Sequence, residues 1–177
     1  VAVARYMATN EPGAMISEAL IKRFRTSADR DMEGVKVAIS GVGHVGAALA
    51  EMLAAEGAKL WISDIDQEAL AEVSAKTGAT IVKPEEIYDL DVDVFAPCAL
   101  GAILNDNTIP RLKAKIIAGS ANNQLEDSQK HGCMVHERGI VYAPDYVINA
   151  GGLINVYQER IGYNRDSSLH AIDAIYD

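Results

Sequence analysis

A glycine-rich turn stands where a short apolar run gives way to a segment with helical spacing. Gly41, Gly43 and Gly46 form a G-x-G-x-x-G motif directly after Val35–Ile39. The first glycine permits a sharp turn, the second lets the main chain approach a pyrophosphate, and the third lets the helix pack closely on a sheet. Unpaired N–H groups at the start of that helix would bind phosphate oxygens. The motif therefore predicts a dinucleotide-binding site.

An acidic residue follows at the spacing that such a site requires. Asp64 ends the next expected strand, 23 residues after Gly41. A carboxylate there can accept hydrogen bonds from both hydroxyls of the adenosine ribose, and it would repel a 2′-phosphate. Since no arginine follows Asp64 closely, the pattern favours NAD over NADP. One alternative stays open, in which the glycines make only a tight turn and Asp64 caps the next helix.

The neighbours of these residues complete the expected cofactor site. The main-chain amides of His44 and Val45 belong to the start of the helix, and Ile65 adjoins the ribose-binding acid, so we place all three in the site. The His44 side chain is expected to face solvent without a catalytic role, because a catalytic histidine needs a positioned partner. Asp66 suits the N-cap of the following helix better than it suits a ribose ligand.

Three later loops combine small residues with side-chain amides. They read APCALGA over Ala96–Ala102, GSANNQ over Gly119–Gln124, and APDYVINAGG over Ala143–Gly152. Each loop follows an expected strand, so all three should meet at the carboxyl edge of a sheet, where a nicotinamide and its substrate would lie. Small residues there let the ring approach the main chain, and the amides can hydrogen-bond its carboxamide.

With these loops in this order, the sequence resembles the NAD-dependent amino-acid dehydrogenases of the Glu/Leu/Phe/Val group. The likeness runs from about Val35 to the end, including Gly162–Arg165 and Ala174–Asp177, and is greatest to the leucine dehydrogenases. It implies reversible oxidative deamination of a branched-chain amino acid, such as L-leucine, to its 2-oxo acid and ammonia. In that reaction a hydride passes from the amino-acid Cα to NAD, and water hydrolyses the imine.

The resemblance also implies roles for residues of the three loops. Cys98, Ala99 and Leu100 would flank the nicotinamide. Asn122 would contact the nicotinamide ribose or the region of the substrate carboxylate, and Asn149 would line the ring. Simpler interpretations remain: Cys98 can be a small buried filler, and the two asparagines can serve only to hold their loops.

Two positions after the loops correspond to family residues that touch the substrate side chain, Leu153 and Val156, although both also fit ordinary helix core. Leu153 is bulkier than the small residues expected in a pocket for an aromatic side chain, which favours branched aliphatic substrates. One methylene group is worth only about 1–3 kcal/mol of discrimination, so valine, leucine and phenylalanine all remain open as substrates.

The elements that must position these loops alternate between strand and helix. Helices are expected over 14–25, 44–56 and 67–76, with Gly57 and Gly78 as stops. Strands are expected over 35–39, 59–63, 80–82, 92–96, 115–118 and 140–143. This alternation predicts an α/β fold, a doubly wound (Rossmann) parallel sheet with helices on both faces and strand order 3-2-1-4-5-6.

We expect a linker-helix region over residues 1–33 and a single NAD-binding Rossmann domain over 34–177. In the family that the sequence resembles, the catalytic lysines and aspartate belong to a substrate domain that precedes the nucleotide domain, and no lysine of this chain matches those motifs. The chain is therefore expected to contain no catalytic residue. As an excised cofactor domain it should bind NAD without turnover, and the L-amino acid would bind only together with the missing domain of a homo-oligomeric parent enzyme.

Charge and composition exclude other classes. The chain has 16 Lys and Arg against 25 Asp and Glu, a net charge of -9, and no basic stripe that could bind nucleic acid. No apolar run reaches the roughly 18 residues of a membrane span. Cys98 and Cys133 fit the reduced thiols of a cytoplasmic protein, and the four histidines lack the spacing of metal ligands, so no metal is expected.

Two other functions compete with this interpretation. A regulatory module that senses NAD, such as an RCK domain, also uses a glycine turn and a ribose-binding acid, but it does not need the later amide-containing loops. Another NAD-dependent oxidoreductase, such as a hydroxy-acid dehydrogenase, would need a histidine with an acidic partner in the cofactor cleft, and no histidine is convincingly placed for that role.

Overall fold

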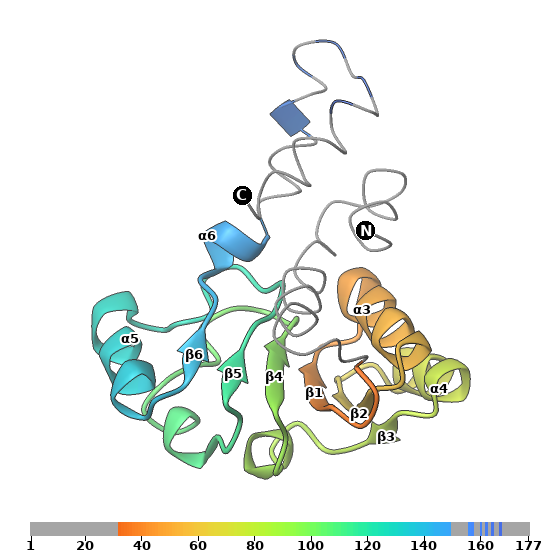
Figure 1. Cartoon of the computed structure of the whole chain (residues 1–177), viewed down its shortest axis with the longest axis horizontal. Helices are drawn as coiled ribbons and strands as arrows, with labels where there is room; N and C mark the ends of the chain where they lie inside the picture. Colours follow the sequence, from red (N-terminus) through yellow and green to blue (C-terminus); the bar gives the residue numbers. More distant parts are fainter. Residues whose placement is uncertain are drawn as a thin grey trace.

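A parallel sheet organises the chain, of which the computed structural model describes residues 32–149 and the isolated positions 156, 157, 160, 162, 164 and 167. Within these residues, six strands pair in the order β3-β2-β1-β4-β5-β6 (Figure 1), which confirms the doubly wound order expected from the sequence. The strands are β1 (Lys36–Ser40), β2 (Lys59–Ser63), β3 (Thr80–Ile81), β4 (Val94–Pro97), β5 (Ile116–Ile117) and β6 (Val141–Tyr142). The expected helix over 14–25, Leu153 and the segments 162–165 and 174–177 lie wholly or mostly outside the described residues.

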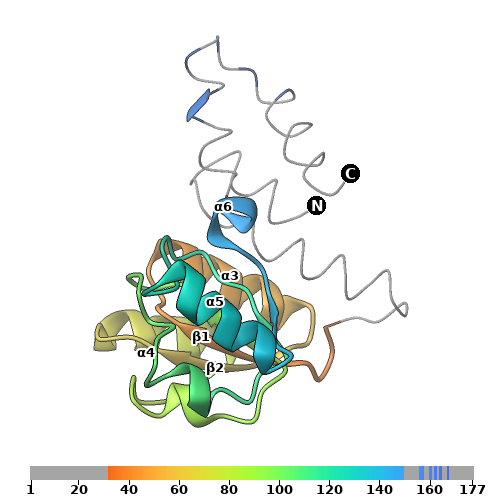
Figure 2. The ribbon, with the colours of Figure 1, turned by 90° about the vertical axis from the view of Figure 1, so that its left-hand side faces the viewer.

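Helices connect these strands. They are α3 (His44–Ala55), α4 (Gln67–Thr77), α5 (Ser128–Glu137) and α6 (Asp145–Ile148), with short 3-10 turns η1 (Ile87–Asp89) and η2 (Ile109–Arg111). Figure 1 shows α3 and α4 beside the half of the sheet that contains β1 to β3, and α5 beside the other half. In Figure 2, α5 faces the viewer and α6 lies above it, beyond the carboxyl edge of the sheet.

Strand β1 is the point at which the strand order reverses. Val37 pairs with Leu60 of β2 on one side and with Val94 of β4 on the other. The chain runs outward from β1 through β2 to β3 and then returns to β4 on the opposite side of β1. Ligands of such sheets bind where the order reverses, outside the carboxyl ends of the central strands. The fold therefore directs attention to the segments that follow β1, β2 and β4.

Successive residues of β1 face opposite sides of the sheet. Val37 and Ile39 pack into a core with α3 and α4, whereas Ala38 packs into a second core with Phe95 and, from α5, Val135. All three β1 residues are buried. A strand covered on both faces reads as a continuous apolar run, which is why β1 has no polar alternation in the sequence.

Helix α4 begins and ends at the capping residues that the sequence predicted. Asp66 is its N-cap, and the Asp66 carboxylate accepts hydrogen bonds from the N–H groups of Glu68 at 3.0 Å and Ala69 at 3.1 Å. At the other end Gly78 has a φ of 72°, the left-handed conformation that ends many helices. The prediction that Asp66 caps this helix is confirmed.

Helix α5 was not expected from the sequence. Only two of its residues are buried, His131 and Val135, and one of them is polar, so the apolar periodicity that reveals amphipathic helices is almost missing. Its start is nevertheless well defined, because the Asp127 carboxylate accepts N–H bonds from Gln129 and Lys130. The sequence therefore contained a capping residue, Asp127, although the hydrophobic pattern of α5 was too weak to predict a helix.

The described packing begins just before β1. Met32 is only 2% exposed and belongs to the core that α3 and α4 cover. Its carbonyl accepts the Val35 N–H at 3.0 Å, and the Gly34 N–H bonds to the Gly57 carbonyl at 3.0 Å. Residues just ahead of the expected boundary at residue 34 thus contribute to the core. Within the described part, no helix is both long and apolar enough to cross a membrane.

Candidate cofactor site

The glycine turn lies between β1 and α3, and two of its glycines have no room for a side chain. Gly41 has a φ of 103°, and a Cβ there would lie 2.5 Å from the Ala99 nitrogen. A Cβ on Gly46 would lie 2.0 Å from the Gly41 carbonyl oxygen. By contrast, nothing lies within 4 Å of a Cβ built on Gly43, which is exposed at the N-cap of α3 without a side-chain cap. The turn therefore presents an open main-chain surface at the start of α3, where Gly43 provides no side-chain cap.

Asp64 joins the end of β2 to this turn. Its Oδ2 accepts the Val42 N–H at 2.6 Å, and its Oδ1 accepts the N–H groups of Ile65 at 2.7 Å and Asp66 at 3.0 Å. The alternative in which Asp64 caps the next helix is wrong, because Asp66 occupies that position. A carboxylate offers about four acceptor sites, so Asp64 can bind these three donors and still accept from a sugar hydroxyl.

Two exposed apolar side chains flank the turn. Ile65 follows β2 and is 90% exposed, and Leu100 follows β4 and is 88% exposed. Both side chains therefore offer apolar surface to solvent at the carboxyl edge of the sheet. The His44 side chain is exposed, as expected, and Val45 is half-buried at the start of α3.

Cys98 lies beneath the loop after β4 while its neighbour Ala99 is exposed. Its side chain packs against the core that includes α3, and its N–H donates to the Ser40 carbonyl at 2.7 Å. Burial raises the pKa of the Cys98 thiol, although hydrogen bonds from Ser120 oppose that effect. The thiol is therefore protonated at neutral pH, which favours the small-filler interpretation over a reactive role.

The two asparagines from different loops meet. The Asn149 side-chain amide donates to the side-chain oxygen Oδ1 of Asn122, which joins the loop after β5 to the end of α6. This bond leaves the Asn122 NH₂ group as a donor and the Asn149 oxygen as an acceptor. The pair therefore holds its loops together, and its polarity is also complementary to a carboxamide. Contact of either residue with a cofactor stays a prediction.

Two residues that sequence reasoning passed over also organise this edge. Gln124 is fully buried, and its amide donates to the carbonyls of Gly119 at 2.6 Å and Ala121 at 3.0 Å. Asp145, at the start of α6, accepts the Asn123 N–H at 2.5 Å. A glutamine closing a loop of small residues was a usable signal for the first of these. Asp145 acts across 22 residues of sequence, which a local pattern cannot reveal.

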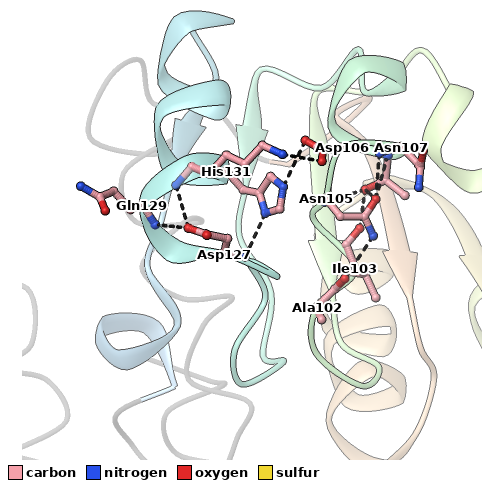
Figure 3. Close-up of polar contacts among 10 residues, drawn as sticks. Ala102, Ile103, Asn105, Asp106, Asn107, Asp127, Gln129 and His131 are labelled. Carbon is pink, nitrogen blue, oxygen red and sulfur yellow. Dashed lines mark hydrogen bonds and ion pairs between the residues drawn. The ribbon is translucent and has the colours of Figure 1, made fainter.

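A histidine with an acidic partner does exist, on α5 (Figure 3) and not on the glycine turn between β1 and α3. His131 of α5 is 2% exposed, its Nδ1 accepts the Asp127 N–H at 2.9 Å, and its Nε2 lies 3.4 Å from Asp106 Oδ1. Lys130 approaches Asp106 Oδ2 to 2.5 Å and lowers the pKa of that carboxyl. The ring is buried and its Nδ1 binds main chain, so the pair joins α5 to the 105–107 turn.

No set of three or more His, Cys, Asp and Glu side chains in the described part is arranged to hold a metal ion. Of the two positions expected to touch the substrate, Val156 is 50% exposed. Leu153 lies outside the described residues.

Comparison with known proteins agrees with the geometry. The profile of the Glutamate/Leucine/Phenylalanine/Valine dehydrogenase family matches residues 61–169. The leucine dehydrogenase of Bacillus cereus is 56% identical over 147 residues, which are 83% of this chain and 40% of that enzyme. This chain belongs to the Glu/Leu/Phe/Val dehydrogenase family. The resemblance inferred from the three loops is confirmed, and family membership favours it over the NAD-sensing module and the hydroxy-acid dehydrogenase.

Other members extend the comparison. The L-tryptophan dehydrogenase of Nostoc punctiforme is 55% identical over 146 residues, 82% of this chain and 41% of that enzyme. A crystal structure of L-tryptophan dehydrogenase from that organism matches with a TM-score of 0.86 and 48% identity, over 94% of this chain and 52% of the other. A hetero-hexameric glutamate dehydrogenase from Thermus thermophilus, 18% identical with a TM-score of 0.68 over 98% of this chain and 44% of the other, shares the fold. The chain spans about two fifths of the length of its curated relatives.

Proposed function

We propose that this chain is the NAD-binding part of an amino-acid dehydrogenase that acts on a branched-chain substrate such as L-leucine. The observation that supports this most directly is the position of Asp64. Its carboxylate lies against the glycine turn, 2.6 Å from the Val42 nitrogen, at the carboxyl edge where the strand order reverses. A ribose hydroxyl that bonds to this carboxylate brings the adjoining pyrophosphate to the start of α3.

The residues present fit a dinucleotide. Gly43 leaves the turn open to a phosphate, and the first N–H groups of α3 have no side-chain cap. Ile65 and Leu100 offer apolar surfaces on the two sides of the turn, suited to the adenine and nicotinamide rings respectively. The Asp64 carboxylate would repel a 2′-phosphate, which selects NAD over NADP.

Bound NAD would accept the hydride that leaves the amino-acid Cα. The chain itself contributes binding and orientation: Asp64 and the α3 amides fix the adenosine half, while Asn122 and Asn149 hold the nicotinamide half by its carboxamide and ribose. The loops after β1, β2, β4 and β5 contain no lysine that could move a proton. We therefore propose that the catalytic groups come from another part of a full-length enzyme; this chain matches 40% of the length of the leucine dehydrogenase of Bacillus cereus.

The substrate class rests on the relatives, which include leucine and L-tryptophan dehydrogenases. The choice of an aliphatic side chain rests on the bulk of Leu153 and is the part of the proposal that the full-length enzyme must test. The relative rates of deamination of L-leucine, L-valine and L-phenylalanine by that enzyme would decide it.

Titration calorimetry with NADH and NADPH tests the cofactor assignment. The chain should bind NADH at least about tenfold more tightly than NADPH, and Asp64→Asn should weaken NADH binding about tenfold while narrowing that ratio, because hydrogen bonds to a charged group and the repulsive charge are both lost. Asp66→Asn removes one negative charge two residues away and keeps a good N-cap. It should therefore change neither the affinity for NADH nor the ratio of NADH to NADPH affinity. A ratio of NADH to NADPH affinity that Asp64→Asn leaves unaltered would contradict the assignment.

The proposal that the catalytic groups lie elsewhere has its own test. With NAD and L-leucine at neutral to alkaline pH, the isolated chain should produce no NADH above the rate of a protein-free control. Sustained NADH formation that follows the chain through purification would refute the claim that the catalytic groups lie elsewhere.

A further inference from the structure

Gln124 is buried at the end of the 119–124 loop that follows β5, two residues after Asn122. Its side chain is 0% exposed and turns back on its own loop. The Nε2 group donates one hydrogen bond to the Gly119 carbonyl at 2.6 Å and a second to the Ala121 carbonyl at 3.0 Å. Both N–H bonds of the amide are therefore directed at main chain within five residues. The side chain closes the loop from the inside.

The loop that Gln124 closes is tightly constrained. A Cβ on Gly119 would lie 2.1 Å from the Pro97 carbonyl oxygen, so this residue rests on the end of β4. Asn123 has a φ of 51°, in the left-handed region that a non-glycine residue seldom adopts. Its carbonyl accepts the Ala102 N–H at 2.6 Å. A conformation of this kind costs free energy and persists only where surrounding contacts hold it.

We propose that Gln124 is a positioning residue of the cofactor site, whose two N–H donors fix the 119–124 loop in the shape that brings Asn122 to Asn149. The inference deepens the proposed function and rests on it, since Asn122 and Asn149 are the residues that would meet the nicotinamide. Gln124 itself touches no cofactor. Its contribution is the conformation of the loop on which Asn122 stands.

The decisive property of the side chain is its capacity to donate, which separates two substitutions of similar size. Gln124→Met fills a similar volume without any donor. Gln124→Glu keeps the shape, but an ionised carboxylate would place the oxygen that replaces Nε2 against the carbonyls of both Gly119 and Ala121. Only the protonated acid can donate, and it donates one bond. Burial beside carbonyl oxygens raises the pKa of such a carboxyl, because both disfavour the charged form.

Hydrogen exchange of the free chain, read by mass spectrometry, measures the loop directly. In Gln124→Met, exchange should rise about tenfold or more in the segment 119–124 and at the Ala102 N–H, because the bonds that hold the loop closed are lost. Exchange in β1 and β2 should stay as in the unsubstituted chain, which shows that the fold is intact. Unchanged exchange in the segment 119–124 would overturn the inference.

Binding of NADH across pH then tests the link to the site. Gln124→Glu should bind NADH at least about tenfold more weakly than the unsubstituted chain at pH 8 and recover part of that loss as the pH falls, because protonation restores one donor. Gln129→Glu makes the same chemical change at an exposed residue in the first turn of α5 and should follow the unsubstituted chain at every pH. If Gln124→Met alters exchange but neither Gln124 variant alters NADH binding, the positioning role is wrong.

The two measurements distinguish a failure of this inference from a failure of the proposed function. An unsubstituted chain that fails to bind NADH defeats the proposed function, whereas hydrogen exchange still decides whether Gln124 holds the loop. If Gln124→Met unfolds, protection from exchange is lost throughout the chain. The Gln124→Glu variant is then compared with itself at high and low pH, so that one polypeptide provides both measurements. Protection of the segment 119–124 must then increase on acidification, and a loop that ignores pH contradicts the role.

Discussion

The side chains of Asp64, Gln124 and Asn149 each form hydrogen bonds with loops of the candidate site in the ligand-free protein. Asp64 alone accepts three main-chain N–H groups. Interactions already formed in the free protein leave less ordering to be done on binding, so a cofactor meets a site that is largely shaped in advance. At the scale of single residues, the same atoms therefore affect both local stability and affinity, and substitutions must be chosen to separate the two.

The glycine turn offers such a separation. Gly46→Ala should lower the free energy of unfolding by about 2 kcal/mol or more, because its Cβ would lie 2.0 Å from the Gly41 oxygen. Gly43→Ala meets no atom within 4 Å and should cost less than about 1 kcal/mol, yet it should weaken NADH binding where the pyrophosphate crosses the turn. Urea unfolding and calorimetry measure the two effects. Equal stability of the two variants would show that the close approach at Gly46 is not restrictive.

The two cysteines should differ in reactivity. Cys133 is exposed on α5, whereas Cys98 is partly covered and burial raises the pKa of its thiol. Because the thiolate is the nucleophile, iodoacetamide at pH 7.5 should alkylate Cys133 well before Cys98. Peptide mapping by mass spectrometry over time gives the order. Faster modification of Cys98 would mean that its loop opens readily in solution.

Among the elements, those with complete local signals were predictable and α5 was not. Strand β2 has the limits expected for it, and α4 ends one residue later than predicted, since Asp66 and Gly78 mark both of its ends. Strand β4 starts at Val94 rather than Val92, because the Val92 N–H bonds locally to the Leu90 carbonyl at 3.1 Å instead of to a neighbouring strand. Helix α5 depends on long-range contacts, which are the packing of Val135 in the second core and the ion pair between Lys130 and Asp106.

That contact predicts how the attachment of α5 depends on pH. Lys130 holds the pKa of the Asp106 carboxyl below its ordinary value. A carboxyl with a lowered folded-state pKa stabilises the fold above its unfolded-state pKa, and the contribution disappears as the pH falls through the folded-state pKa. Asp106→Asn should therefore lower the thermal midpoint by the same small amount at pH 6 and pH 8, with the difference shrinking below about pH 4.

Thermal unfolding followed by circular dichroism at several pH values measures this difference. Asp91→Asn is a suitable control, because that exposed carboxylate forms an ion pair with Lys36 on β1 and has no contact with α5. A difference between Asp106→Asn and the unsubstituted chain that grew on acidification would contradict the assigned sign.

For the molecule as a whole, the order of all six strands could be predicted because the chain alternates strand and helix and the glycine turn marks β1. The edge at which the functional loops meet followed from that order. The specific contacts did not: the pairing of Asn122 with Asn149 and the closure by Gln124 depend on side-chain directions set by tertiary packing. The sequence thus predicted which loops form the site, but not which residues hold them.

A substitution at Met32 can test whether the hydrophobic core includes residues that precede β1. Met32 packs with the residues covered by α3 and α4 although it precedes β1. Met32→Ala should lower the free energy of unfolding by about 2–3 kcal/mol, because it leaves a cavity in a closely packed core. Met52, half-buried on α3, gives a control that should cost clearly less as Met52→Ala. Equal losses would indicate that the core does not extend to Met32.

Because β1 lies between β2 and β4 in the sheet, one of its edges stays unpaired during translation until β4 has been made. Its partner β2 follows within 25 residues, but its other partner, β4, pairs Val94 with Val37 across 57 positions. Until β4 leaves the ribosome, a half-sheet of β1, β2 and β3 presents an unpaired apolar edge to the cell. Such edges recruit strands from other chains. Aggregation of translation products that stop before Val94, and its suppression once β4 is included, would be the signature of this order of assembly.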